Sequence, residues 1–347
     1  MERTRNRGTS RGRVVNKKRT ILTGDRPSGP LHLGHYVGSL KNRVLLQESH
    51  EQFIMIADVQ ALTDNFKHPE MVRKNVYEVA LDYLSVGIDP EKSTLFIQSC
   101  IPQISELAVF YLNLVTVNRL RRNPTIKTEI AQKGYGEQVT AGFLMYPVHQ
   151  AADITIIKGT IVPVGADQMP ILEQTNEIIH TFNRIYKTSF FEPVEGLLSS
   201  APRLIGLDGK AKMSKSLGNA IFLSDDSDTV LKKVMSMYTD PNHLHVHEPG
   251  KIEGNVVFSY LDIFDSNSDE VLGLKEHYTR GGLGDVVIKK RLASILNTLL
   301  DPIRERRAYY NNHFDFVTQS LAKGTECARL RAESTMDEVR KVMHLNY

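Results

Sequence analysis

Two short motifs, far apart in the sequence, contain residue types suited to binding phosphate. The first is Pro30–His35 (PLHLGH) and the second is Lys212–Ser216 (KMSKS). The first motif supplies two imidazoles, and a glycine that lets a ligand approach the backbone closely. The second supplies two lysines, whose ammonium groups can stabilise charge that develops on a leaving phosphate. Together the two motifs predict a site for a nucleoside triphosphate.

The residues around the first motif predict a strand, a turn and then a helix. Residues 20–24 form an apolar run, residues 27–30 contain two prolines and a glycine, and apolar spacing from Leu33 to Leu45 is helical. A helix N-terminus offers free N–H groups and positive dipole to an anion. The second motif is flanked by Gly206, Gly209 and Gly218, which predicts a loop that can close over the triphosphate.

Plainer interpretations exist for both motifs. His32 and His35 could be a surface pair at a helix start, or two ligands of a metal ion, and a run of lysines is usually a solvated surface. The combination of a histidine turn at a strand end and a complete KMSKS sequence favours the nucleotide interpretation.

A polar stripe lies between these motifs. On a helix, Tyr146, Gln150 and Asp153 would share one face of an otherwise apolar segment. Burial without partners would cost roughly 1 to 3 kcal/mol for each group, and a ligand with N–H donors would remove that cost. A surface helix or a buried structural network are the alternatives. Downstream, Asp167 could bind a ribose or ammonium group, or simply cap a helix, and Gln168 could bind an amino acid's polar head.

The order of apolar runs predicts an α/β fold with a doubly wound, parallel, Rossmann-like sheet. Runs at residues 20–24, 52–58, 94–98 and 161–164 read as strands buried on both faces, and helical stretches at 69–86 and 105–120 separate them. Ligands of such sheets bind beyond the carboxyl ends of the strands, where the polar residues named above fall.

After Ser216 the strand pattern stops and a C-terminal helical domain is predicted. Helical patterns cover residues 225–240, 255–275, 284–312 and 325–344. We therefore expect a basic, disordered tail at residues 1–19, a catalytic domain at 20–222 that includes the lysine loop, and a helical domain at 223–347.

Composition and charge narrow the class of protein. The chain has 347 residues, of which 41% are apolar and 24% charged, as in an ordinary globular protein. The net charge of +3 is the sum of +7 on residues 1–19 and −4 on the rest of the chain. Any nucleic-acid surface on the folded part must therefore be a local basic patch. Two cysteines, Cys100 and Cys327, make no disulfide framework, and a cytoplasmic location is expected. No apolar run is long enough to span a membrane.

Taken in order, these segments resemble bacterial-type tryptophanyl-tRNA synthetases, which are class I aminoacyl-tRNA synthetases. The resemblance rests on Gly24–Gly29 (GDRPSG), the histidine turn, Tyr146–Ile154, Val162–Gln168 and KMSKS, and it extends from about Thr20 to the C-terminus. It implies ATP-dependent attachment of L-tryptophan to tRNA(Trp) through a tryptophanyl-adenylate, an anticodon-reading helical domain and a homodimer. ATP with Mg²⁺ would be the substrate complex, and no tightly bound protein metal is expected.

The resemblance also implies roles for individual residues. Asp153 would accept the indole N–H, while Tyr146 and Gln168 would hold the ammonium and carboxylate groups. The tryptophan site would be completed by Gln60 and Gln150. The expected ATP-binding residues are Gly24, Asp25, Arg26, His32, Gly34, His35, Gly165, Asp167, Lys212, Met213, Ser214 and Lys215. The expected catalytic residues are His35, Lys212, Lys215 and Ser216.

Four positions depart from the family pattern. Most members have Ile-Gln at Asp25-Arg26, a methionine at Gln150 and a histidine at Gln60. These changes predict a divergent form with a rearranged pocket wall and altered sensitivity to inhibitors that mimic tryptophan. A tyrosyl-tRNA synthetase, or a non-catalytic paralogue that binds tRNA or a protein, are the alternative functions.

Two basic clusters are candidate RNA contacts, although each could equally be a solvated helix face. One contains Arg119, Arg121, Arg122 and Lys127, and the other contains Lys289, Lys290, Arg291, Arg304, Arg306 and Arg307. The alternating His243, His245 and His247 could suggest a metal site, but a loop is the favoured interpretation.

Overall fold

A five-stranded parallel sheet forms the centre of the molecule, and the sequence predicts its parallel order and four of its strands. The computed structural model describes residues 18–198, 203–215 and 217–347, so most of the predicted tail and Ser216 lie outside the described residues. The strand order is β3-β2-β1-β4-β5. The strands are β1 (Thr20–Asp25), β2 (Glu51–Ile56), β3 (Ser93–Ile97), β4 (Ile161–Val164) and β5 (Glu195–Leu198). The order reverses between β1 and β4, which in open parallel sheets marks the ligand crevice.

Strand β5 is absent from the sequence prediction. It has only four residues and its side chains are mostly exposed, so it lacks the apolar run by which the buried strands are recognised. Backbone pairing with β4, in the register Ile161 opposite Glu195, holds it at the sheet edge.

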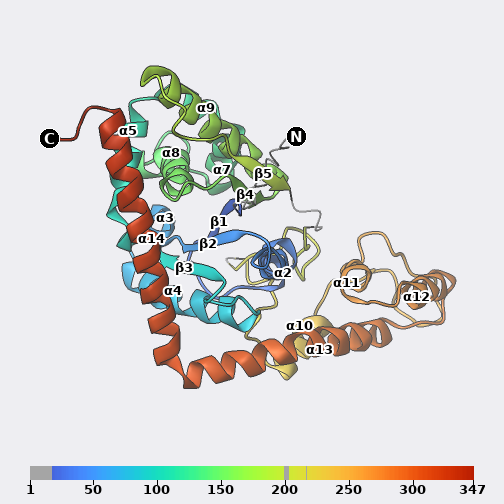
Figure 1. Cartoon of the computed structure of the whole chain (residues 1–347). Helices are drawn as coiled ribbons and strands as arrows, with labels where there is room; N and C mark the ends of the chain where they lie inside the picture. The colour runs from blue at the N-terminus through green and yellow to red at the C-terminus, as the bar shows by residue number, and fades with distance from the viewer. Residues whose placement is uncertain (1–17, 199–202, 216) are drawn as a thin grey trace, which may run out of the picture.

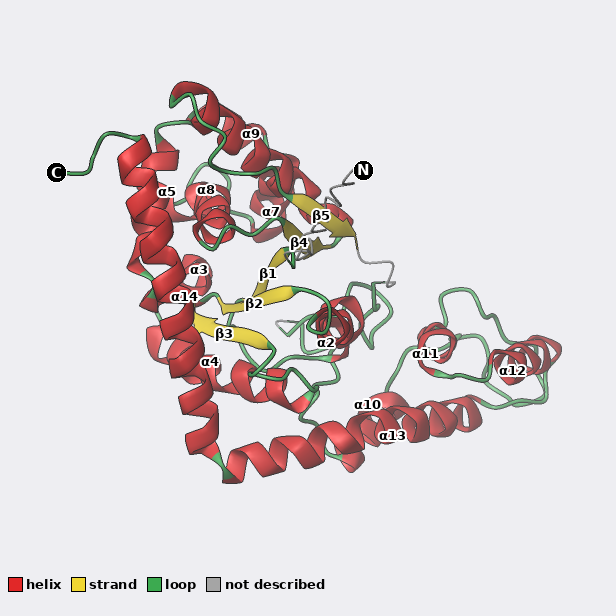
Figure 2. Cartoon of the chain, in the orientation of Figure 1, coloured by secondary structure: helices red, strands yellow, loops and turns green. Residues whose placement is uncertain are grey.

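Helices connect the strands and cover both faces of the sheet (Figures 1 and 2). The predicted helix at 105–120 is in fact two helices, because Thr116 caps a new helix with its side chain. The helices of this part are α1 (Leu33–His35), the π-helical turn η1 (Tyr36–Leu40), α2 (Lys41–Leu46), α3 (Asp58–Asn65), α4 (Pro69–Ser85), α5 (Pro102–Leu112), α6 (Val117–Arg122), α7 (Pro124–Lys133), α8 (Ala141–Ile156) and α9 (Met169–Ile185), with short 3₁₀ turns η2 (Gln98–Cys100) and η3 (Ala166–Gln168).

Alternating side chains of the strands divide the core between the two faces. Along β2, Phe53 and Met55 pack in the core that contains α5, α8 and α9, while Ile54 and Ile56 pack in the core on the other side. This alternation follows from the two-residue period of a strand. The second core continues without a break into apolar residues of the C-terminal helices.

The C-terminal part is helical, as predicted, and its helices α11 and α12 project away from the sheet (Figure 1). The predicted helix at 255–275 is interrupted by Asp265 and by Asn267, which caps the following helix. The helices are α10 (Ser227–Met235), α11 (Val256–Phe264), α12 (Ser268–Arg280), α13 (Asp285–Asn312) and α14 (Phe314–Val342). None of the helices in the described part of the chain is long and apolar enough to cross a membrane.

The last helix, α14, returns along the sheet and packs against β3. Thr325 accepts a hydrogen bond from the Ile97 backbone at 3.2 Å, and Arg331 pairs with Glu51 at 2.7 Å. A Cβ on Gly324 would lie 2.0 Å from the Leu95 carbonyl oxygen. The helix can therefore approach the strand only because residue 324 has no side chain.

This close approach predicts opposite effects for two glycine-to-alanine substitutions. Gly324→Ala should lower the free energy of unfolding by about 2 kcal/mol or more, because α14 must shift off β3. Gly273→Ala, in α12, meets nothing within 4 Å and should raise stability by up to about 1 kcal/mol. Chemical denaturation of both variants measures the difference. Equal stability of the two variants would contradict the packing argument.

Candidate active site

Two adjoining cavities form one crevice at the carboxyl ends of β1 and β4. The larger cavity measures about 1190 Å³ and contains both phosphate-binding motifs, and the smaller one measures about 450 Å³ and contains the polar stripe of α8. The residues that line both cavities are Arg26, Ser28, His35, Ser39 and Gly165. The three predicted elements thus meet at one place.

Backbone hydrogen bonds hold the two motifs together. The Leu33 N–H donates to the Ile221 carbonyl, and the Leu223 N–H donates to the Leu31 carbonyl, both at 3.0 Å. Residue His32 forms an antiparallel bridge with Phe222, directly after the lysine loop. The turn at the start of α1 is therefore paired, backbone to backbone, with the short segment that follows the KMSKS sequence.

The two histidines of the first motif arrange the start of α1. The Nδ1 of His32 accepts from the Gly34 N–H at 3.1 Å, and the Nδ1 of His35 accepts from the His32 N–H at 3.2 Å. Burial lowers the pKa of His32 to about 3, with His35 and Lys215 adding to the effect. Burial likewise lowers the pKa of His35 to about 4. Both rings are therefore neutral at pH 7, and because each Nδ1 accepts a hydrogen bond, each Nε2 carries the proton and can donate to a ligand.

The lysine loop is fixed on both sides by backbone contacts. The Met213 N–H donates to the Leu204 carbonyl at 2.9 Å, and the Ser214 N–H donates to Asn219 Oδ1 at 2.8 Å. The Lys215 ammonium reaches across the crevice and donates to the Gly29 carbonyl at 2.6 Å. Burial lowers the pKa of Lys215. This lysine therefore lies in the larger cavity, next to the turn that precedes α1.

Asp153 lies at the base of the smaller cavity with no exposed surface. Its Oδ1 accepts from Gln98 Nε2 at 2.8 Å, and its Oδ2 is buried with no partner among the described residues. A buried carboxylate oxygen without a donor is costly, so the site is arranged for a ligand that brings an N–H or O–H group.

Two residues that orient Asp153 were not among the predicted site residues. The first, Gln98, also accepts from the Gln60 N–H at 3.1 Å and so joins β3 to α3. The second, His149, lies one turn before Asp153, with its Nδ1 3.7 Å from Asp153 Oδ1. Burial opposes protonation of His149, but the Asp153 carboxylate prevails and raises its pKa. In the sequence, the one sign that His149 contacts Asp153 is its place four residues earlier on the same predicted helix.

Asp25 belongs to a buried network beneath the first motif. Its Oδ2 accepts from Arg43 Nη1 at 2.7 Å and from the Tyr83 hydroxyl at 2.8 Å. Although burial opposes ionisation, the Arg43 guanidinium holds the pKa of Asp25 below its usual range. The carboxylate lines the smaller cavity, yet its charge is already balanced from within the protein. A direct contact between Asp25 and ATP stays a prediction.

Further ion pairs cross the mouth of the larger cavity and were not predicted. Arg26 donates to Asp64 at 3.1 Å, and Lys133 and Tyr135 bind the same carboxylate from the far side. Asp167 pairs with Arg203 at 2.5 Å. These side chains come from five separate segments, which sequence spacing cannot bring together.

Most of the predicted residues line one cavity only, while Arg26, His35 and Gly165 line both. The larger cavity is lined by Arg26, His32, Gly34, His35, Gly165, Asp167, Lys212, Met213, Ser214 and Lys215. The smaller cavity is lined by Gly24, Asp25, Gln60, Tyr146, Gln150, Asp153 and Gln168. Gly24 also has a structural reason to be glycine, because a Cβ there would lie 2.3 Å from the Met55 carbonyl oxygen. Ser216 lies outside the described residues.

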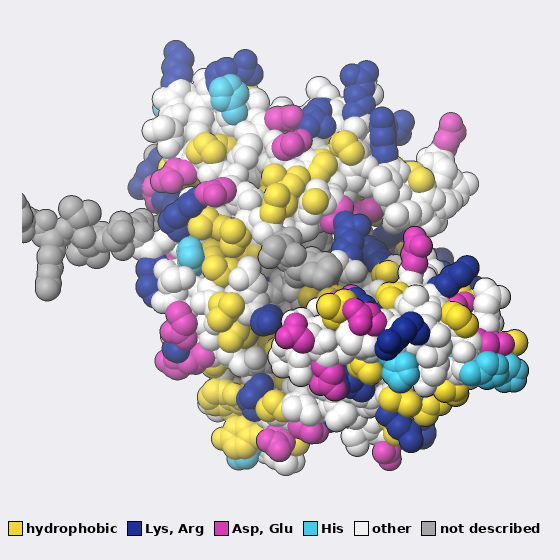
Figure 3. Space-filling model, turned by 90° about the vertical axis from the view of Figure 1, so that its right-hand side faces the viewer, with side chains coloured by type: hydrophobic (Ala, Val, Ile, Leu, Met, Phe, Trp, Pro, Cys, Tyr) yellow, Lys and Arg dark blue, Asp and Glu magenta, His cyan; other side chains and the backbone are white. Residues whose placement is uncertain are grey.

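Some members of the predicted basic clusters are paired within the protein. Arg119 binds Glu177 at 2.8 Å, and Arg291 binds Asp265 at 2.7 Å. Basic and acidic side chains are interspersed over the face shown in Figure 3. An RNA contact by the other members of the first cluster stays a prediction.

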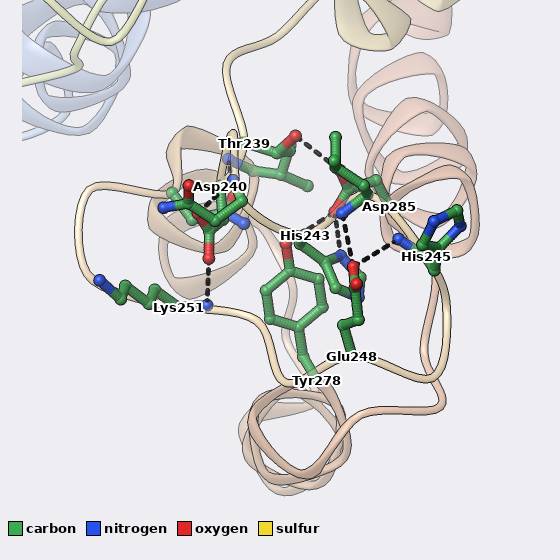
Figure 4. Close-up of polar contacts among 12 residues, drawn as sticks. Thr239, Asp240, His243, His245, Glu248, Lys251, Tyr278 and Asp285 are labelled. Atoms are coloured by element: carbon green, nitrogen blue, oxygen red, sulfur yellow. Dashed lines mark hydrogen bonds and ion pairs between the residues drawn. The ribbon is translucent and has the colours of Figure 1, made fainter.

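The residues around the alternating histidines form a loop, as predicted. His243 is buried against Tyr278, with its Nδ1 3.4 Å from Asp285 Oδ1, while His245 and His247 are exposed (Figure 4). Within the described residues, no three His, Cys, Asp or Glu side chains are grouped as metal ligands.

Comparisons with known proteins agree with this geometry. The family model for class I tRNA synthetases (W and Y) matches residues 15–301. Tryptophan–tRNA ligases of Streptococcus agalactiae and Streptococcus mutans are 59% and 58% identical to the chain over 95% of its length and 99% of theirs. A tryptophanyl-tRNA synthetase from Campylobacter jejuni, solved with ADP and tryptophan, has a TM-score of 0.82 and 30% identity, covering 94% of this chain and 100% of that one.

The fold, the crevice and the family match identify the chain as a class I aminoacyl-tRNA synthetase of the tryptophan and tyrosine family. Within that family it belongs with the tryptophanyl-tRNA synthetases, because its relatives at 57 to 59% identity carry that activity in their names.

Proposed function

We propose that the chain attaches tryptophan to tRNA(Trp) in two steps within the crevice. The tryptophan carboxylate attacks the α-phosphate of ATP, and pyrophosphate leaves with its bond electrons, giving tryptophanyl-adenylate. A terminal ribose hydroxyl of the tRNA then takes the aminoacyl group and releases AMP. The observation that carries the proposal is the unpartnered, buried oxygen of Asp153 beside a cavity lined by both nucleotide motifs.

The smaller cavity is the proposed tryptophan site. Asp153 Oδ2 accepts the indole N–H, while Gln98 and His149 hold the carboxylate in place. Tyr146 and Gln168, which line the same cavity, bind the ammonium and carboxylate groups. Gln60 and Gln150 form polar parts of the cavity wall. The site then selects tryptophan by the hydrogen bond from the indole N–H to Asp153, and it rejects analogues that lack this N–H.

The larger cavity is the proposed site for ATP, which enters as its Mg²⁺ complex. The neutral His32 and His35 and the glycine at position 34 receive the phosphates at the start of α1, and Lys212 and Lys215 stabilise the leaving pyrophosphate. Gly165 and Asp167 lie where the ribose would fit, and Arg26, Met213 and Ser214 complete the wall. No protein nucleophile is needed, so catalysis consists of positioning and charge stabilisation. Ser216 stays a predicted catalytic residue.

Residues 20–222 would form the catalytic domain, and residues 223–347 the helical domain that reads the anticodon. The projection of α11 and α12 away from the sheet supports a contact far from the crevice (Figure 1). The return of α14 to β3 shows that the last helix also supports the catalytic sheet. The Streptococcus relatives are bacterial, and we place this activity in the cytoplasm.

Asp153→Asn tests the proposed tryptophan site. The amide places a donor where an acceptor is needed, so discrimination between tryptophan and phenylalanine should fall by roughly two orders of magnitude. Amino-acid-dependent ATP–pyrophosphate exchange, run with tryptophan, phenylalanine and tyrosine, measures this ratio. Asp58→Asn is the matched control, because Asp58 binds Ser99 at the end of the neighbouring strand and lines neither cavity. Unchanged discrimination in Asp153→Asn would show that another residue reads the indole, and exchange with tyrosine alone would reassign the substrate.

Lys215→Ala tests the nucleotide site. Loss of the ammonium removes a charge that stabilises the leaving group, so the exchange rate should fall by about 100- to 1,000-fold with little change in tryptophan affinity. Lys210→Ala, on the exposed part of the same loop, should exchange at close to the unmodified rate. A near-normal rate for Lys215→Ala would exclude the proposed role.

We propose further that two copies of the chain associate through the face beside the tryptophan site. An apolar cavity of about 390 Å³ lies there, with Leu62, Phe66 and Met145 in its wall, and Phe66 is 60% exposed. This cavity shares Gln60 and Tyr146 with the smaller cavity, so a second copy would close the tryptophan site from outside.

A mass measurement in solution tests this association. Light scattering should give twice the chain mass of 39.2 kDa, and Phe66→Glu should shift the mass towards the single chain because a charge would be buried. A wild-type mass of one chain would rule the dimer out.

A further inference from the structure

The arginines at the end of α13 face the catalytic core rather than an RNA. Arg306 Nε donates to the Ser85 carbonyl at 2.5 Å, and Arg304 Nη1 donates to the Asp225 carbonyl at 3.1 Å. Arg307 binds both Glu78 and Asp82, and its side chain is only 16% exposed. These residues were predicted as a possible RNA cluster, and their contacts instead join α13 to α4 and to the segment after the lysine loop.

Asp82 is the junction between α13 and the first phosphate motif. Its Oδ1 accepts from Arg307 Nη1 at 2.5 Å, and its Oδ2 accepts from the Leu31 N–H at 2.7 Å. The side chain is fully buried. A buried carboxylate needs both a positive partner and hydrogen-bond donors, and here the partner is on α13 and the donor is in the turn before His32.

The turn that contains Leu31 also binds the residues that follow the lysine loop. Leu31 accepts from the Leu223 N–H, and Asp225 accepts from the Phe222 N–H at 2.8 Å. Because Arg304 binds the Asp225 carbonyl, one turn of α13 contacts both supports of the histidine motif.

The opposite end of α13 is also fixed. Asp285, its first residue, accepts from the Thr239 hydroxyl and from the Tyr278 hydroxyl, each at 2.7 Å (Figure 4). The helix has 28 residues and is about 42 Å long, and Pro302 within it removes one helical hydrogen bond. It connects the α11–α12 region to Asp82 on α4.

We propose that Arg307 and Asp82 are positioning residues of the adenylation reaction, which hold the backbone at Leu31 so that His32, Gly34 and His35 meet the phosphates. The proposal rests on the nucleotide site described above. Burial raises the pKa of Asp82 to about 6, even though Arg307 opposes the shift. Loss of Arg307 would therefore favour the neutral carboxyl group, which is a weaker acceptor for the Leu31 N–H.

The experiment compares ATP affinity and tryptophan affinity in Arg307→Gln, Asp82→Asn and the double variant. Asp82→Asn keeps an oxygen for Leu31 but turns an amide donor towards Arg307. We expect each single variant to weaken ATP binding, and raise the KM for ATP, by about tenfold, as for loss of a buried charged hydrogen bond. The KM for tryptophan should stay within about twofold. The double variant should match the single variants, because the two residues act as one unit.

Two further variants separate positioning from general stability. Arg307→Lys keeps the charge but loses the two-pronged contact with Glu78 and Asp82, and should restore part of the ATP affinity. Arg340→Gln breaks an equivalent pair, in which Arg340 binds Glu106 and joins α14 to α5 away from the crevice. This control should change the melting temperature without a change in ATP affinity.

ATP affinity is measured by calorimetry without tryptophan, and the kinetic constants by pyrophosphate exchange. Wild-type ATP affinity in a folded Arg307→Gln protein would overturn the proposal, as would equal changes in ATP affinity for Arg307→Gln and Arg340→Gln. Absence of tryptophan-dependent exchange in the unmodified protein would instead overturn the proposed function. The calorimetric comparison would still decide the role of Arg307.

Discussion

The site depends on one short backbone pairing, in which residues 31–33 bind residues 221–223. The pairing brings together a histidine turn and a lysine loop that are about 180 residues apart in the sequence. Backbone hydrogen bonds fix direction and register more firmly than side-chain contacts, because each partner has little freedom once its neighbours are ordered. The position of Lys215 over the Gly29 carbonyl follows from this pairing.

Three aspartates of the core, Asp82 and Asp153 fully buried and Asp25 mostly so, show how environment assigns different functions to one side chain. Asp25 is neutralised by Arg43, and Asp82 connects Arg307 to a backbone N–H, so both have partners within the protein. Among the described residues, Asp153 has a partner on one oxygen only. A buried acceptor that the protein leaves unpaired is the stronger indication of a ligand, because folding alone would favour a partner for it.

Long helices extend these local contacts across the molecule. The α13 helix connects the projecting helices to the support of the first motif, and α14 covers β3 through the contact that Gly324 allows. The face of the sheet that carries Ile54 and Ile56 shares its core with the C-terminal helices. Displacement of those helices would therefore expose apolar surface beside the crevice, which opposes independent movement of the two parts.

Local periodicity and short motifs are enough to predict the parallel sheet, the strand-turn-helix at His32 and His35, the polar stripe of α8 and the lysine motif. The residues that complete these features are selected by the packing of distant elements. Gln98 and His149 support Asp153, Arg43 balances Asp25, and β5 joins the sheet by pairing with β4. The sequence also could not predict that Arg307 points inward, because its carboxylate partners lie more than 200 positions earlier in the chain. Such contacts depend on how distant elements pack, and neither segment carries a periodic pattern that indicates its partner.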